Sequence, residues 1–136
     1  MKTRTMMCTL AIALMISGAA WATNFKMQAT SVDPGAQGTV TVDAGKAGEN
    51  ASIKVKVEHL AKPSLLTPPA SAYVVWIEQS GEAPQNGGTI RVGDDEKGEV
   101  SMTTTAPRFT VLITAETDTR PQTPSDRVML RSNVQQ

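Results

Sequence analysis

The sequence has very few residues of the kinds that build most catalytic and metal centres. It contains one cysteine, Cys8, and one histidine, His59. A single thiol excludes an internal disulfide and a cysteine-based zinc site, and a lone histidine has no second histidine to complete a ligand set or a relay. No G-x-S-x-G nucleophile motif occurs. We therefore expect no enzyme, no metal site and no cofactor.

Charges of one sign do not cluster, and aromatic residues are few. The 136 residues include 13 Lys plus Arg and 13 Asp plus Glu. No basic stripe or Lys/Arg run is present, so we expect no nucleic-acid binding. Aromatic residues make up 4% of the chain. Tyr73 and Trp76 fall on opposite faces of one strand by the period-two rule, which excludes a flat sugar-binding platform and favours a buried Trp76.

The apolar run near the N-terminus is shorter than the about 20 residues that a membrane span requires. It covers residues 10–16, follows two basic residues, and precedes Ala20-Trp21-Ala22, an A-x-A-like cleavage site. This arrangement predicts a signal peptide over residues 1–22, with retention as an uncleaved anchor as the alternative. The mature chain is then one domain over residues 23–136, periplasmic or secreted, with no stable membrane span.

The rest of the sequence alternates apolar and polar residues with a period of two, which is typical of strands. Residues 52–58 alternate Ile and Val with Lys and Glu, and residues 39–42 alternate Val with Thr. Shorter strands are predicted at residues 90–92 and 100–102. The turn-forming residues 93–98 between them predict a hairpin.

Two segments, residues 72–77 and 109–115, are apolar on both faces and are expected to be central strands covered above and below. A last strand is predicted at residues 127–131 and an edge strand at residues 25–32. No stretch of ten residues has helical periodicity. Short strands at this spacing are typical of an all-β sandwich or small barrel, and the proline-rich segment 61–71 favours the sandwich because it suits a crossover between sheets.

Two groups of residues invite a metal-binding interpretation. His59 with Met27, Met102 and Met129 contains the thioether ligands that reduced copper prefers, but these methionines are dispersed along the chain. Residues 94–96 are acidic but lack the D-x-D-x-D-G spacing of a calcium loop. We interpret the methionines as packing residues and the acidic triplet as a solvated turn.

A set of apolar and turn residues between positions 73 and 130 has a recognisable order. It consists of Tyr73-Val74-Val75-Trp76-Ile77, Gly81, Pro84, Gly88, Phe109, Ile113-Thr114-Ala115-Glu116 and a proline-containing loop before Val128. This stretch resembles the extracytoplasmic C-terminal domain of anti-sigma-K-type factors. The resemblance implies an immunoglobulin-like antiparallel β-sandwich, here of seven or eight strands, and an envelope-side role in sensing or protein contact. It implies no catalytic residue, and we expect no sigma-binding domain because only a short signal precedes the module.

The loop at residues 61–71 is the candidate partner-binding element. It carries Leu65 and Leu66 between Pro63 and Pro68-Pro69. Exposed leucines on a proline-stiffened loop can anchor a partner, because such a loop loses little entropy on binding. The alternative is that both leucines fold back and cap the end of the sandwich.

The sequence thus predicts an exported, non-enzymatic β-sandwich that binds another protein of the bacterial envelope, through this loop or by strand addition at a sheet edge. The alternative function is a small-ligand or carbohydrate-binding module. The sequence does not indicate the oligomeric state.

Overall fold

The computed structural model describes residues 22–44, 50–118 and 120–135. Within these ranges the chain forms nine β-strands and one short 3-10 helix. They are β1 (Ala22–Lys26), β2 (Gln28–Ala29), β3 (Gln37–Asp43), β4 (Ala51–Glu58), η1 (Pro63–Leu65), β5 (Ala72–Glu78), β6 (Gln85–Ile90), β7 (Gly98–Thr104), β8 (Arg108–Glu116) and β9 (Val128–Gln135). The predicted signal peptide over residues 1–22 lies outside the described residues except for Ala22.

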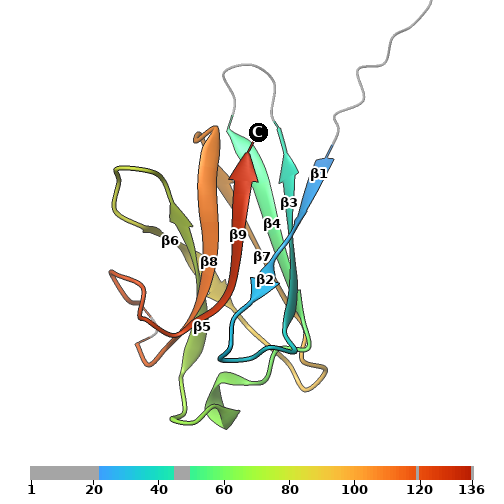
Figure 1. Ribbon diagram of the computed structural model, residues 1–136, viewed down its shortest axis with the longest axis vertical. Coiled ribbons are helices and arrows are strands. Elements are labelled where there is room, and N and C mark those ends of the chain that lie inside the picture. The colour runs from blue at the N-terminus through green and yellow to red at the C-terminus, as the bar shows by residue number, and fades with distance from the viewer. Residues whose placement is uncertain (1–21, 45–49, 119, 136) are drawn as a thin grey trace, which may run out of the picture.

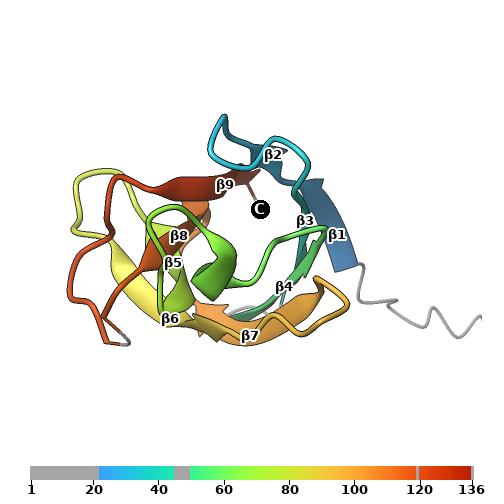
Figure 2. The ribbon, with the colours of Figure 1, turned by 90° about the horizontal axis from the view of Figure 1, so that it is seen from below.

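The strands form two antiparallel sheets that pack face to face (Figures 1 and 2). One sheet has the order β1-β3-β4-β7 and the other β2-β9-β8-β5-β6. In immunoglobulin-like sandwiches, strands B and E are neighbours in one sheet and strands C and F in the other. Here β4 and β7 take the places of B and E, and β5 and β8 those of C and F. The predicted β-sandwich is confirmed.

The core between the sheets follows from the alternating sequence. Along β4, every second residue is buried, and Ile53, Val55 and Val57 are at most 1% exposed. The polar residues between them face solvent, where Lys54 and Lys56 lie 3.1 and 3.8 Å from the carboxylate of Glu99. Such exposed ion pairs contribute little to stability, so burial of the apolar positions is the main stabilising contribution of this strand.

The predicted central strands are also confirmed. β8 lies in the middle of the five-stranded sheet, with β5 beside it. Tyr73, at the start of β5, packs into the core between the sheets, whereas Trp76 packs with Val74 and Leu112 in a separate cluster. The two aromatic rings therefore lie on opposite faces of β5, as the period-two rule predicts. Both residues are 0% exposed.

A chain of hydrogen bonds borders this second cluster. The indole Nε1 of Trp76 donates to Oγ1 of Thr114 at 2.8 Å, and the Thr114 hydroxyl donates to Oε1 of Glu116 at 2.5 Å. The backbone N–H of Ser125 donates to the same carboxylate oxygen at 2.8 Å. Asn86 Nδ2 donates to the Pro121 carbonyl at 3.3 Å. These bonds hold the β8–β9 connection against the five-stranded sheet.

The hairpin predicted from residues 90–92 and 100–102 is wrong. β6 pairs with β5, whereas β7 pairs with β4 in the other sheet. The intervening residues 91–97 form a turn as predicted, but the turn carries the chain from one sheet to the other. Gly98 permits this crossing, because a Cβ there would lie 2.6 Å from the carbonyl oxygen of Arg91.

The two ends of the chain also differ from the predictions. The edge strand expected at residues 25–32 is divided into β1 and β2, which pair with β3 and β9 in different sheets. This division gives nine strands where seven or eight were expected. The last strand continues to Gln135, beyond the predicted 127–131. Within the described ranges, no helix has the length and apolar character to cross a membrane.

Candidate binding loop

The connection between β4 and β5 closes one end of the sandwich, together with the β2–β3 and β6–β7 connections (Figure 1). It begins at His59, an exposed residue whose φ of 53° turns the chain away from β4. The next residue, Leu60, is 0% exposed and packs into the core. Its backbone N–H donates to the carbonyl of Glu96 at 3.2 Å. The connection is therefore attached to the core and to the neighbouring loop from its first residues.

Three further contacts fix the part of the connection before η1. The hydroxyl of Tyr73 donates to the carbonyl oxygen of Ala61 at 2.5 Å. Lys62 forms an ion pair with Asp94 in the β6–β7 connection. The backbone N–H of Leu65 donates to the Lys62 carbonyl at 2.9 Å.

The part after η1 is fixed by the carbonyl of Pro63. This oxygen accepts from the N–H of Leu66 at 3.2 Å and from the N–H of Ala70 at 2.9 Å. The peptide bond between Thr67 and Pro68 is cis. The two hydrogen bonds to the Pro63 carbonyl close residues 63–70 into a loop that carries η1 at its tip.

The structure separates the two leucines of the candidate site. Leu66 is partly buried and packs against the core, whereas the side chain of Leu65 is 72% exposed. Leu66 thus folds back onto the core, as the capping alternative predicts, and only Leu65 of the two is exposed for contact with a partner. Val32, in the β2–β3 connection, is the other large hydrophobic residue that is exposed among the described residues, at 46%.

The electrostatics of this end depend on Tyr73 and the Lys62–Asp94 pair. Burial raises the pKa of Tyr73 to about 12, and the nearby negative charge of Asp33 adds to the effect. The hydrogen bond from Lys62 lowers the pKa of the Asp94 carboxyl below its ordinary value. Tyr73 is therefore a neutral hydrogen-bond donor, and Asp94 is a carboxylate, throughout the physiological pH range.

The residues considered for metal binding do not come together. Met27 and Met129 are buried in the core, Met102 packs beside it, and His59 is exposed at the end of β4. The acidic triplet is engaged locally, since Oδ1 of Asp95 accepts from the backbone N–H of Lys97 at 3.3 Å. Among the residues that the structure describes, no group of three or more His, Cys, Asp or Glu is placed to hold a metal ion.

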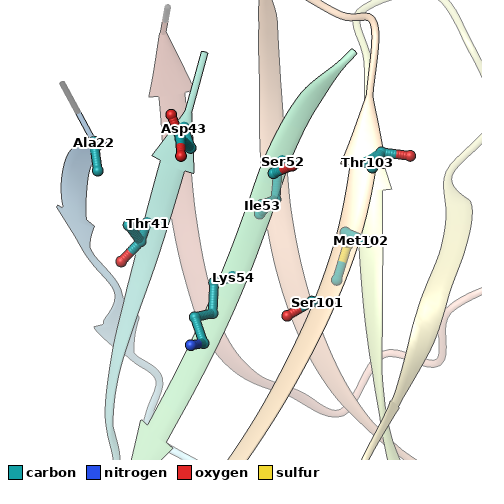
Figure 3. A pocket seen from close by; sticks show the side chains of 9 residues that line it. All are labelled: Ala22, Thr41, Asp43, Ser52, Ile53, Lys54, Ser101, Met102 and Thr103. Carbon is teal, nitrogen blue, oxygen red and sulfur yellow. The ribbon is translucent and has the colours of Figure 1, made fainter. Parts of the chain in front are cut away.

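A second feature is a hollow of about 460 Å³ on the solvent-facing side of the four-stranded sheet (Figure 3). Polar side chains from three adjacent strands line it: Thr41, Asp43, Ser52, Lys54, Ser101 and Thr103. No aromatic residue is among its lining residues. The period-two pattern predicts that these positions face outward, but it does not predict that β3, β4 and β7 lie side by side, so the hollow was not predicted.

Comparison with known proteins gives no assignment. No protein-family model matches the chain, and no curated protein matches it.

Proposed function

We propose that this protein is an exported, non-enzymatic binding module of the bacterial envelope that docks a partner protein on the end of the sandwich carrying η1. The observation that carries the proposal is Leu65, whose side chain is 72% exposed at the tip of a fixed loop. A partner that covers this side chain gains the free energy of apolar burial.

The fixed conformation of the loop supports this proposal. Ordering a flexible segment costs binding free energy, whereas a loop already held by Tyr73, Asp94 and the Pro63 carbonyl loses little freedom when a partner docks. Leu66 anchors the loop from the inside, so that Leu65 is presented outward. Val32, on a connection at the same end, adds apolar surface for a partner (Figure 1).

Export and envelope location are supported by the sequence. Residues 1–22 have the basic start, apolar centre and A-x-A-like end of a signal peptide. The resemblance of residues 73–130 to the extracytoplasmic domain of anti-sigma-K-type factors supports a role in sensing or protein contact on the outer side of a membrane. Cell fractionation with N-terminal sequencing tests this part, and protein found only in the cytoplasm with residue 1 intact contradicts it.

In-cell cross-linking tests the binding role. The complete chain, tagged at its C-terminus, is expressed in its host, cross-linked and purified, and its captured proteins are compared with those of Leu65→Asp. We expect one protein recovered in a stoichiometric amount by the original chain and lost with Leu65→Asp, because a carboxylate at the tip opposes apolar docking.

Ser64→Asp is the matched control, since Ser64 is exposed in the same 3-10 helix and the variant adds the same charge. It should retain the partner. Equal capture by the original chain and both variants contradicts docking through Leu65. Capture of no protein by correctly exported and folded chain contradicts the partner-binding function.

A small-ligand module is the second candidate, and the hollow on the four-stranded sheet favours it. Hydroxyl groups with one carboxylate and one ammonium group suit a polar ligand such as a saccharide, which they bind by hydrogen bonds without an aromatic platform. Saturation-transfer NMR with saccharides tests it. Saccharide signals that the original protein gives and a Thr41→Val, Ser101→Ala double variant does not give would support ligand binding in the hollow over protein docking.

A further inference from the structure

Residues 86 and 87 in β6 are an asparagine followed by a glycine. Asparagine occurs at positions 24, 50, 86 and 133 of the sequence, and only Asn86 precedes a glycine. In such a pair the backbone nitrogen of the glycine can attack the side-chain amide carbon of the asparagine, because glycine has no Cβ to obstruct the approach. Asn86 is exposed, so water reaches the reacting groups. This dipeptide is therefore a candidate modification site.

The pairing of β6 with β5 is irregular at this dipeptide. Asn86 lies opposite Trp76 and Gly88 lies opposite Val75, so the register omits Gly87. Gly88 has a φ of 124°, a conformation that residues with a Cβ rarely adopt. An extra residue of this kind bends the strand and interrupts its regular ladder of hydrogen bonds. The nitrogen of Gly87 therefore belongs to a bulge and not to a regular cross-strand pair.

The side chain of Asn86 is folded forward along the chain. Its Oδ1 accepts a 2.9 Å hydrogen bond from the backbone N–H of Gly88, two residues later. This is an Asx turn, in which the side chain takes the place of a peptide group in a β-turn. The turn folds Cγ of Asn86 back toward the Gly87 nitrogen, and ring closure requires these two atoms at a near-attack distance of about 3–3.5 Å. The N–H of Gly88 also stabilises the negative charge that develops on Oδ1 during the attack.

We propose that Asn86 is a site of spontaneous deamidation, and that the product frees the β8–β9 connection from β6. The Gly87 nitrogen loses its proton to hydroxide and forms a bond to Cγ of Asn86. The Cγ–Nδ2 bond breaks, and Nδ2 takes a proton from water and leaves as ammonia. One water molecule then opens the five-membered succinimide ring at either carbonyl, which gives aspartate or isoaspartate at position 86. Water and hydroxide are the only co-reactants.

The reaction breaks a contact between β6 and the β8–β9 connection. In the unmodified protein, Nδ2 of Asn86 donates to the carbonyl of Pro121 at 3.3 Å. Pro121 is buried, and the connection lies on the outer side of the five-stranded sheet (Figure 2). A carboxylate at position 86 has no N–H to donate, and its negative charge repels the carbonyl oxygen. Deamidation therefore replaces an attraction with a repulsion at this contact.

The other attachment of the connection is independent of Asn86. The backbone N–H of Ser125 donates to the carboxylate of Glu116 at 2.8 Å, and the Ser125 hydroxyl donates to the carbonyl of Ala115 at 3.0 Å. These bonds remain after deamidation, so we expect the connection to loosen near Pro121 without unfolding of the sheet. The inference does not depend on the proposed partner binding through the loop that carries η1.

Peptide mass spectrometry tests the deamidation. The protein is expressed from its complete coding sequence, purified in its folded form, incubated at neutral and at mildly alkaline pH, and digested. Asn86 should convert at least about tenfold faster than Asn24 and Asn133, which precede residues with a Cβ. The rate should rise with the hydroxide concentration, and the product should contain isoaspartate as well as aspartate. If Asn86 in the folded protein converts no faster than the other two asparagines, the proposal is overturned.

Amide hydrogen exchange tests the effect on the connection. Asn86→Asp carries the charge of the product from the start, and exchange at residues 120–125 should be about threefold to tenfold faster than in the original protein, as expected for the loss of one hydrogen bond. Asn133→Asp is the matched control, because it makes the same change at an exposed position of the same sheet, where Oδ1 still accepts from the Thr110 hydroxyl. It should leave this exchange unchanged. Equal exchange in Asn86→Asp and the original protein overturns the proposed loosening of the connection.

Discussion

The hydroxyl group of Tyr73 donates a hydrogen bond of 2.5 Å to the carbonyl oxygen of Ala61, twelve residues earlier in the chain. This bond joins the start of β5 to the loop that carries Leu65. Tyr73 is 0% exposed, so its hydroxyl forms a hydrogen bond with the Ala61 carbonyl instead of with water. A single side chain therefore contributes to the core and also fixes the candidate binding loop.

Replacing Tyr73 with Phe should affect both stability and the loop. The ring and its packing remain, but the Ala61 carbonyl loses its donor, and we expect the free energy of unfolding to fall by about 1–1.5 kcal/mol. Urea denaturation followed by circular dichroism measures this change. Amide hydrogen exchange should become faster at residues 61–66 and stay unchanged at Ala51 and Ser52, at the far end of β4 from the loop. If residues 61–66 of the variant are protected from exchange as strongly as those of the original protein, Tyr73 is not the anchor of this loop.

Tyr73 also predicts how stability depends on alkaline pH. Its pKa is raised to about 12 in the folded protein, above the value of about 10 for an exposed tyrosine. The folded state therefore holds the proton more tightly than the unfolded state does. The resulting stabilisation is fully present below pH 10, falls as the pH rises from 10 to 12, and amounts to about 2.7 kcal/mol.

The measurement of this alkaline effect is direct because Tyr73 is the sole tyrosine in the sequence. Tyrosinate absorbance should titrate near pH 12 in the folded chain and near pH 10 in urea. The Tyr73→Phe variant should lose the part of the alkaline destabilisation that belongs to this group. An absorbance midpoint near pH 10 in the folded protein would contradict the burial of the hydroxyl.

The polar network beside Trp76 gives a third prediction. Thr114→Val keeps the branched shape but removes the hydroxyl that accepts from Trp76 Nε1 and donates to Glu116. The indole N–H then lacks a partner in a buried site, which should cost about 1–3 kcal/mol of unfolding free energy. Thr110→Val on the same strand is the control. Its hydroxyl donates to Asn133 at the exposed surface, so its loss should cost less than about 0.5 kcal/mol. Equal effects of the two variants in urea denaturation contradict a structural role for the network.

The alternating pattern of side chains was the most informative part of the sequence. It predicted the buried positions of β4, the central places of β5 and β8, and the opposite orientations of Tyr73 and Trp76. Each of these is determined within one strand, because successive side chains of a strand point to opposite faces. The pattern says nothing about which strand lies beside which, and the errors occurred at that level.

The predicted hairpin shows this limit. Two short strands separated by a turn rich in Gly and Asp usually pair, but β6 and β7 lie in different sheets. The packing of Ile90 and Gly98 at the crossing depends on contacts between the sheets, which local sequence does not report. The hollow lined by Thr41 and Ser101 was not predicted for the same reason, because it requires the order β3-β4-β7.

The two leucines of the candidate loop could not be distinguished from sequence either. In a 3-10 helix, successive residues are about 120° apart around the axis, since there are about three residues per turn. η1 ends at Leu65 and the chain becomes extended at Leu66. One leucine therefore points to solvent and the other to the core. This outcome depends on where the short helix ends, which the prolines alone do not determine.

Gly98 should be among the positions least tolerant of a side chain. A Cβ there would lie 2.5 Å from Ile90 Cγ2 and 2.6 Å from the Arg91 carbonyl oxygen, and a backbone atom at that distance has little room to move. We expect Gly98→Ala to lower the melting temperature and to cost about 1–3 kcal/mol through displacement of the crossing between the sheets. Gly35→Ala is the control, since the nearest atom to its Cβ is Asp33 Oδ1 at 3.9 Å. That variant should change the unfolding free energy by less than about 0.5 kcal/mol. If calorimetry gives the same melting temperature for both variants, the close approach of the two sheets at Gly98 is not required for the fold.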